Sequence, residues 1–302
     1  MIDVILLTGF LGSGKTTCLN RLLQRLSGRY SRIAVVMNEF GSIGIDGRLV
    51  EDPGHLVELE NGSIFCVCIR ENFLAAMAKL AQEFQPEGVI IEATGVADPL
   101  EMGDFLAYPG LRDVYRLHRT VTLVDALNFP KVIQTLRAAR AQAQAADVFL
   151  MTKTDLVDHR ADTLLEELLL GINPYALRFN APFCQLSDEE WDVILGATGV
   201  EQEYTPGSRH AERATPPARD PMTSVTVALA PFATAEMAKS TIVASLPSNA
   251  LRAKGFIDVA GQTHLFQYTL GEAECVVWAE PVETTGEIVI IGLNLERHQI
   301  KL

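Results

Sequence analysis

A nine-residue stretch near the start of the chain, GFLGSGKTT over positions 9–17, constrains the fold more than any other part of the sequence. It matches the pattern G-x-x-x-x-G-K-[ST] and lies between an apolar run over 4–7 and a helical apolar pattern over 18–26. This order predicts a strand, a tight glycine-rich turn and a helix. Inward-facing backbone N–H groups of such a turn and the positive end of the helix together bind phosphate. The predicted ligand is a nucleoside triphosphate.

The pattern also assigns roles inside this loop. Lys15 can reach the terminal phosphates, and the hydroxyl of Thr16 can ligate Mg²⁺. The loop around them supplies the other predicted nucleotide contacts, at Gly9, Gly12, Ser13, Gly14 and Thr17.

Composition limits the partners of the chain. At 302 residues, with 48% apolar and 21% charged residues, it can form one large or two ordinary domains with a sizeable core. A formal charge of −13 without a basic patch argues against nucleic acid as a partner. No run approaches the ~20 apolar residues of a membrane span, and the first residues lead straight into the glycine-rich loop as a strand rather than a signal peptide. Together with five mostly scattered cysteines, these features predict a cytoplasmic protein with reduced thiols.

Buried-strand patterns alternate with helical patterns through the first 200 residues. Apolar runs over 33–37, 88–91, 121–124 and 148–151 are typical of parallel strands covered on both faces. The second run ends at Glu92, with Gly95 three residues on. An acid at the tip of such a strand can hold Mg²⁺ or its water, and the glycine lets a backbone N–H approach the γ-phosphate. After the first run comes Glu39 in a glycine-rich and acidic loop, which is either a ligand loop or a solvated turn.

A helical pattern over 131–145 leads to the 148–151 strand, which we expect to be the last strand of the domain. The motif Thr152-Lys153-Thr154-Asp155 follows this strand. An aspartate at this place can accept hydrogen bonds from N1–H and the exocyclic amine of guanine, donors that adenine lacks. Lys153 can lay its stem along the base. Thr152 stands where asparagine is commonest in guanine-binding loops. The sequence therefore predicts GTP and GDP as ligands, and a P-loop kinase or plain ATPase is disfavoured.

Composition changes after residue 200. Residues 201–221 hold four prolines, several charges and hardly any large apolar residue, which is typical of a linker. Beyond it, strand patterns surround one helical pattern over 235–246, the order of a helix packed on an antiparallel sheet. We therefore expect an α/β P-loop NTPase domain with a mostly parallel sheet over 1–200, a linker over 201–221, and a smaller α+β domain over 222–302.

The loop at 9–17, the Asn38-Glu39-Phe40-Gly41 segment, the run from Glu92 to Pro99 and the motif at 152–155, in this order, resemble the CobW family of P-loop GTPases. The segments over 251–256 and 288–292 resemble its C-terminal domain. The resemblance implies a slow, Mg²⁺-dependent GTPase that acts as a metallochaperone or cofactor-insertion factor. Catalysis would then depend on Lys15, Glu39 and Glu92, with Mg²⁺ on Thr16 and on an acid from Glu39 or Glu92.

The metal motif departs from the family pattern Gly-Cys-x-Cys-Cys. After Gly62, the first two family cysteines align with Ser63 and Phe65, Cys66 alone keeps its place, and Cys68 is an additional thiol. Two thiolates can ligate one soft ion such as Zn²⁺ or Co²⁺, but a closed zinc site needs four ligands. The rest would come from Glu39, Glu60, His55, water or a second subunit, which would make a homodimer. Alternatively, Cys66 and Cys68 are partly buried residues of a switch segment without metal.

Two functions follow from the resemblance. In the first, the nucleotide state controls delivery of Zn²⁺ or Co²⁺ to a protein client through switch segments over 39–46 and 62–70. In the second, the chain is a GTP-driven activator of a corrinoid protein or metalloenzyme and holds no transition metal of its own. We interpret Cys18, Cys184 and Cys275 as core residues in both.

Overall fold

The computed structural model describes residues 1–28, 30–38, 56–59, 67–95, 97–196, 220–282 and 285–300; for 38, 56–59 and 67–72 it describes only the backbone. The described residues form two compact units, one before residue 219 and one from Asp220 onward. The linker predicted over 201–221 lies almost wholly outside the described residues, so the domain boundaries stay a prediction.

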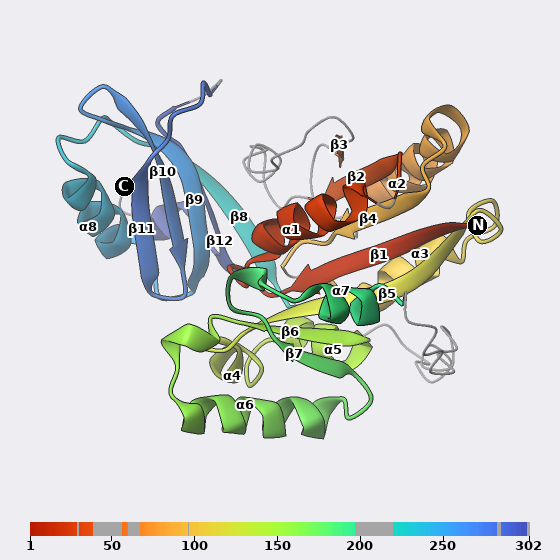
Figure 1. Ribbon diagram of the computed structural model, residues 1–302. Helices are drawn as coiled ribbons and strands as arrows, with labels where there is room; N and C mark the ends of the chain where they lie inside the picture. The colour runs from red at the N-terminus through yellow and green to blue at the C-terminus, as the bar shows by residue number, and fades with distance from the viewer. Residues whose placement is uncertain are drawn as a thin grey trace. The chain divides into compact units, whose positions relative to one another are not determined.

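The first unit is built on a parallel sheet of seven strands in the order β3-β2-β4-β1-β5-β6-β7 (Figure 1). All six pairings between neighbouring strands are parallel. Parallel neighbours need crossover connections, and helices supply most of them. The strands are β1 (Ile2–Gly9), β2 (Ile33–Asn38), β3 (Leu56–Leu59), β4 (Gly88–Glu92), β5 (Tyr115–Asp125), β6 (Val148–Thr152) and β7 (Leu177–Asn180). The helices are α1 (Lys15–Ser27), α2 (Val67–Lys79), α3 (Pro99–Leu106), α4 (Phe129–Val132), α5 (Arg137–Ala145), α6 (His159–Ile172) and α7 (Asp188–Ile194).

Alternate residues of the central strands point to opposite faces of this sheet and form two cores. On one face, Leu7 and the apolar residues of neighbouring strands that point the same way pack against α1 and against Trp191 of α7. On the other face, Leu6 and the strand residues that point with it pack against Phe73 of α2 and Met102 of α3. Both faces are covered, which explains why β1, β4 and β6 appear in the sequence as continuous apolar runs.

Two local expectations were wrong. The 148–151 strand does not end the sheet, because β7 follows it with only four residues and a half-buried, exposed alternation. So short an edge strand leaves a weak pattern. The helical stretch expected over 131–145 is two helices, because Leu136 between them has an extended backbone (φ −109°, ψ 120°).

The second unit is an antiparallel sheet of five strands in the order β11-β10-β9-β12-β8. Helix α8 (Ala235–Ser245) packs on it through Ala238 and Ile242, which join strand residues such as Phe266 and Ile290 in one core. Its strands are β8 (Met222–Ala228), β9 (Ala250–Val259), β10 (Gln262–Thr269), β11 (Glu272–Val277) and β12 (Glu287–Leu293). The expected α+β fold is confirmed. In the described residues of both units, every helix is too short or too polar to cross a bilayer.

Candidate nucleotide-binding site

Three glycines with left-handed backbones shape the loop between β1 and α1. Gly9, Gly12 and Gly14 have φ values of 139°, 75° and 94°, a region that costs other residues strain. At Gly9 a side chain is also excluded by space, because a Cβ would lie 2.6 Å from the carbonyl oxygen of Leu123 and 2.8 Å from Oγ of Ser13. The loop closes with a hydrogen bond from the N–H of Ser13 to the oxygen of Phe10 (3.2 Å). The sequence-predicted phosphate loop thus has the backbone that the motif requires.

Lys15 starts α1 and folds back over this loop. Its side chain is buried, and Nζ donates to the carbonyl oxygens of Gly9 (2.9 Å) and Phe10 (3.3 Å). A buried ammonium needs such acceptors. The cation is therefore held inside the loop, where phosphate oxygens can compete for its hydrogens.

Buried hydroxyl groups gather around the loop. Thr8 Oγ1, Ser13 Oγ and Thr94 Oγ1 are all buried, and within the described residues none has a hydrogen-bond partner. Leaving such a group unsatisfied costs about 1–3 kcal/mol, so the cluster indicates a polar ligand. Glu92, which pairs with Leu7 in the sheet, also has a buried carboxylate. Thr16 lies half-buried in the first turn of α1. Hydroxyl and carboxylate oxygens of this kind fit Mg²⁺ and the phosphates it accompanies.

The segment after β4 packs directly on the phosphate loop. A Cβ on Gly95 would lie 2.6 Å from the backbone nitrogen of Leu11, so only glycine allows this approach. Gln142 of α5, which is 1% exposed, donates from Nε2 to the carbonyl oxygens of Gly95 and Ala97 (3.1 Å each). Sequence analysis missed Gln142, because a glutamine in an alanine-rich helix carries no local signal of a contact 47 residues away.

The Thr152–Asp155 motif meets the same loop from the other side. Thr152 is buried and donates from Oγ1 to the carbonyl oxygen of Ser13 (2.9 Å). Lys153 has a left-handed backbone (φ 56°), and its Nζ pairs with Asp125 Oδ2 at 2.8 Å. Asp155 lies exposed on the 3₁₀ turn that follows β6. Thr152 and Lys153 are therefore held by contacts within the protein, while Asp155 is exposed to solvent.

Asp125 ends β5, and sequence analysis assigned it no role at the site. It is buried, and its carboxylate also accepts hydrogen bonds from the backbone N–H groups of Leu127 (3.0 Å) and Asn128 (3.1 Å). These contacts satisfy the charge and fix the position of the Lys153 head group.

Two thiols lie beneath the phosphate loop. Cys18 and Cys184 are each 1% exposed, and Cys184 Sγ donates to the carbonyl oxygen of Gly14 (3.9 Å). A hydrogen bond with Cys184, together with burial, raises the pKa of Cys18 well above its ordinary value. Both are free core thiols, and Cys275 of the second unit is half-buried against its core. The core interpretation is confirmed for Cys18 and Cys184, whereas Cys275 is only partly buried at the edge of its core.

The predicted transition-metal ligands cannot be placed. Glu39, Cys66 and the side chain of Cys68 lie outside the described residues, as do His55 and Glu60. Over the ranges that the structure describes, no three His, Cys, Asp or Glu side chains come together as a metal site.

Two family models match the chain. Residues 3–179 match the nucleotide-binding domain of CobW/HypB/UreG, and residues 223–302 match the cobalamin synthesis protein cobW C-terminal domain. The chain belongs to the CobW family. The resemblance found in the four sequence motifs is therefore confirmed, and so is the expected fold class.

Among curated CobW relatives, the zinc chaperone YjiA of Escherichia coli K12 is 35% identical over 182 residues, covering 58% of this chain and 56% of that protein. The zinc-regulated GTPase metalloprotein activator 1 of Schizosaccharomyces pombe is 31% identical over 210 residues, covering 66% and 50%. The chain thus spans about half the length of the curated relatives it matches. The solved Zn(II)-bound YjiA GTPase from E. coli aligns over 99% of this chain and 96% of that one, with 24% identity and a TM-score of 0.48.

Proposed function

We propose that this chain is a slow Mg²⁺-dependent GTPase that couples its nucleotide state to delivery of Zn²⁺ or Co²⁺ to a protein client. The observation that carries the proposal is the meeting of three sequence motifs on one loop. Gly95 packs on Leu11, Thr152 bonds to Ser13, and Lys15 lies within the loop itself. The names of the curated relatives, zinc chaperones and a zinc-regulated GTPase metalloprotein activator, support the delivery role.

Each residue has a physical task in this proposal. Lys15 would exchange the carbonyl oxygens of Gly9 and Phe10 for phosphate oxygens, which carry far more charge. Thr16 and an acid from Glu39 or Glu92 would hold Mg²⁺, which neutralises phosphate charge when bound. The backbone N–H groups of the loop from Gly9 to Thr17 would surround the phosphates. Asp155 would accept the two guanine donors.

Gly95 would couple the nucleotide state to the conformation of the rest of the first unit. Its neighbours are Leu11 of the phosphate loop on one side and Gln142 of α5 on the other. A movement of the segment around Gly95 on loss of the γ-phosphate would therefore displace both Leu11 and Gln142. The cysteines of the 62–70 segment lie in the second predicted switch, so nucleotide would set metal affinity there. By linkage, metal would change nucleotide affinity by the same factor.

One observation favours a second candidate. Ser63 and Phe65 stand where the family pattern has cysteines, which leaves only Cys66 and Cys68 as thiol ligands. An activator that reshapes a corrinoid protein or metalloenzyme without holding a transition metal needs no such ligands. In either candidate we propose a cytoplasmic protein. A homodimer is proposed only for the metal-binding candidate, where a second subunit would complete the ligand set.

Equilibrium binding of Zn²⁺ and of Co²⁺ to the purified chain, loaded with GDP or a non-hydrolysable GTP analogue, tests the proposal. The test variant is Cys66→Ala/Cys68→Ala, and Cys275→Ala, a thiol of the other unit, is the matched control. Metal delivery predicts tight binding that depends on the first two thiols and changes with nucleotide. If neither nucleotide state has a site that depends on them, metal delivery is wrong and the activator candidate takes its place.

A further inference from the structure

The turn after β7 is strained at two successive residues. Phe183 and Cys184 in the 3₁₀ turn Pro182–Cys184 have φ values of 54° and 53°. Left-handed backbones of this kind cost non-glycine residues roughly 1–2 kcal/mol each, and persist only where the surroundings impose them. Such strain is concentrated at ligand sites.

Strong contacts hold the turn on either side of Phe183. Before it, Ala181 is fully buried and its N–H donates to the oxygen of Met151 (2.8 Å). After it, the N–H of Cys184 donates to the oxygen of Ala181 (2.9 Å), and its thiol contacts Gly14 of the phosphate loop. The turn is therefore fixed to β6 and to the start of α1.

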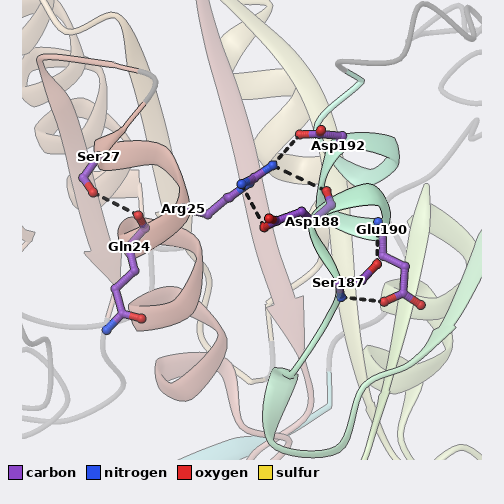
Figure 2. A network of polar contacts seen from close by, with 7 residues as sticks. All are labelled: Gln24, Arg25, Ser27, Ser187, Asp188, Glu190 and Asp192. Carbon is purple, nitrogen blue, oxygen red and sulfur yellow. Dashed lines mark hydrogen bonds and ion pairs between the residues drawn. The ribbon is translucent and has the colours of Figure 1, made fainter.

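The next helix is tied to α1 as well. Arg25 Nη1 pairs with Asp188 Oδ1 (2.9 Å) and Nη2 with Asp192 Oδ1 (2.8 Å), and Figure 2 shows the guanidinium between the two carboxylates. Ser187 begins α7 with a capping box to Glu190, also drawn in Figure 2. In the middle of this anchored segment Phe183 is 64% exposed. The contacts that hold this strained turn therefore keep one apolar ring exposed to solvent.

This ring lies at the same edge of the sheet as the base-reading motif. Strands β6 and β7 are parallel neighbours, with Met151 opposite Asn180, so the turns that follow them leave the sheet side by side. Thr154 Oγ1 donates to Asn180 Oδ1 and joins the two turns directly. Two exposed side chains, Asp155 and Phe183, stand on these joined turns.

We propose that Phe183 is a base-recognition residue whose ring stacks on the face of the purine that Asp155 reads at its edge. The stem of Lys153, whose head group is held by Asp125 at 2.8 Å, forms the opposite wall. Aromatic rings stack on nucleobases through their π-faces, so Phe183 supplies affinity for any purine while Asp155 supplies discrimination. This inference rests on the proposed function and extends it from the phosphates to the base.

Calorimetric titration of the full chain with GDP and with inorganic tripolyphosphate, both with Mg²⁺, tests the proposal. The test variant is Phe183→Ala. Tyr175→Ala is the matched control, because Tyr175 is 75% exposed at the opposite end of β7. We expect Phe183→Ala to weaken GDP between about 5- and 150-fold, the range of base–aromatic stacking, and to leave tripolyphosphate within about 2-fold. Phe183→Trp, which keeps an aromatic face, should retain GDP affinity.

The outcomes separate the two levels of the proposal. Wild-type protein that binds GDP while Phe183→Ala binds it equally well overturns stacking and leaves the proposed function standing. Equal loss of GDP and tripolyphosphate also overturns stacking, because the residue would then only support the phosphate loop. Wild-type protein that binds no GDP overturns the proposed function and this inference together.

Discussion

The phosphate loop is closed on itself, whereas the turns after β6 and β7 present their side chains to solvent. Lys15 is buried on the carbonyl oxygens of its own loop, while Asp155 and Phe183 are exposed. Hydrogen bonds from Thr152 to Ser13 and from Cys184 to Gly14 join the two regions. Under the proposed function, this difference corresponds to a preformed phosphate site with tight geometry and a base site that is completed by its ligand.

The largest effect is expected at the phosphate loop. Lys15→Ala removes the cation that would compensate the γ-phosphate, and a single transition-state donor is worth about 10²–10³ in rate. We therefore expect GTP hydrolysis to fall to background in a phosphate-release assay. Near-normal turnover by this variant would show that the loop is not the catalytic site.

Gly95→Ala tests how tightly the closed region is packed. The new Cβ would lie 2.6 Å from the backbone nitrogen of Leu11, so either the loop or the 93–97 segment must move. We expect turnover to fall about 10-fold or more, since displacements of about 1 Å can cost 10². Gly171→Ala, which meets nothing within 4 Å, is the control and should behave as wild type. Equal turnover rates for Gly95→Ala and Gly171→Ala would show that Gly95 does not couple the nucleotide to the rest of the unit.

At the turns after β6 and β7, a substitution should change the selectivity among nucleotides rather than the rate of hydrolysis. Asp155→Asn replaces an acceptor pair with an amide, so it should cut the preference for GTP over XTP roughly 100-fold. Competition binding against a fluorescent GDP analogue measures this ratio. Glu166→Gln, an exposed carboxylate on α6, is the control. An unchanged ratio in Asp155→Asn would mean that another group reads the base.

The smallest effect is expected where α7 meets α1. Arg25 pairs with Asp188 and Asp192, which raise the pKa of its guanidinium, yet all three side chains are solvent-accessible. Arg25→Ala should lower the thermal midpoint by only about 1–2 °C, and less at high salt, because water and ions screen such pairs. Arg21→Ala, an exposed residue of the same helix, is the control. A large loss that salt does not reduce would show that the segment carrying Phe183 depends on this pair.

The two regions also differ in how far the sequence could predict them. The phosphate loop is one continuous motif, so the backbone of Gly9–Thr17 and the place of Lys15 followed from local pattern alone. Thr152–Asp155 was found in the same way. The turn at Phe183, the pairing of Asp125 with Lys153 and the contacts of Gln142 were missed. Each depends on partners far away in the chain or on an edge strand of four residues, and no local periodicity records such contacts.

A direct test of the central claim is calorimetric binding of GTP analogue and ATP analogue to the wild-type chain in the presence of Mg²⁺. The account predicts that both engage the phosphate loop but that the guanine nucleotide binds at least about 100-fold more tightly, because adenine leaves Asp155 unpaired. Equal affinity for the two, or binding of neither, would contradict it.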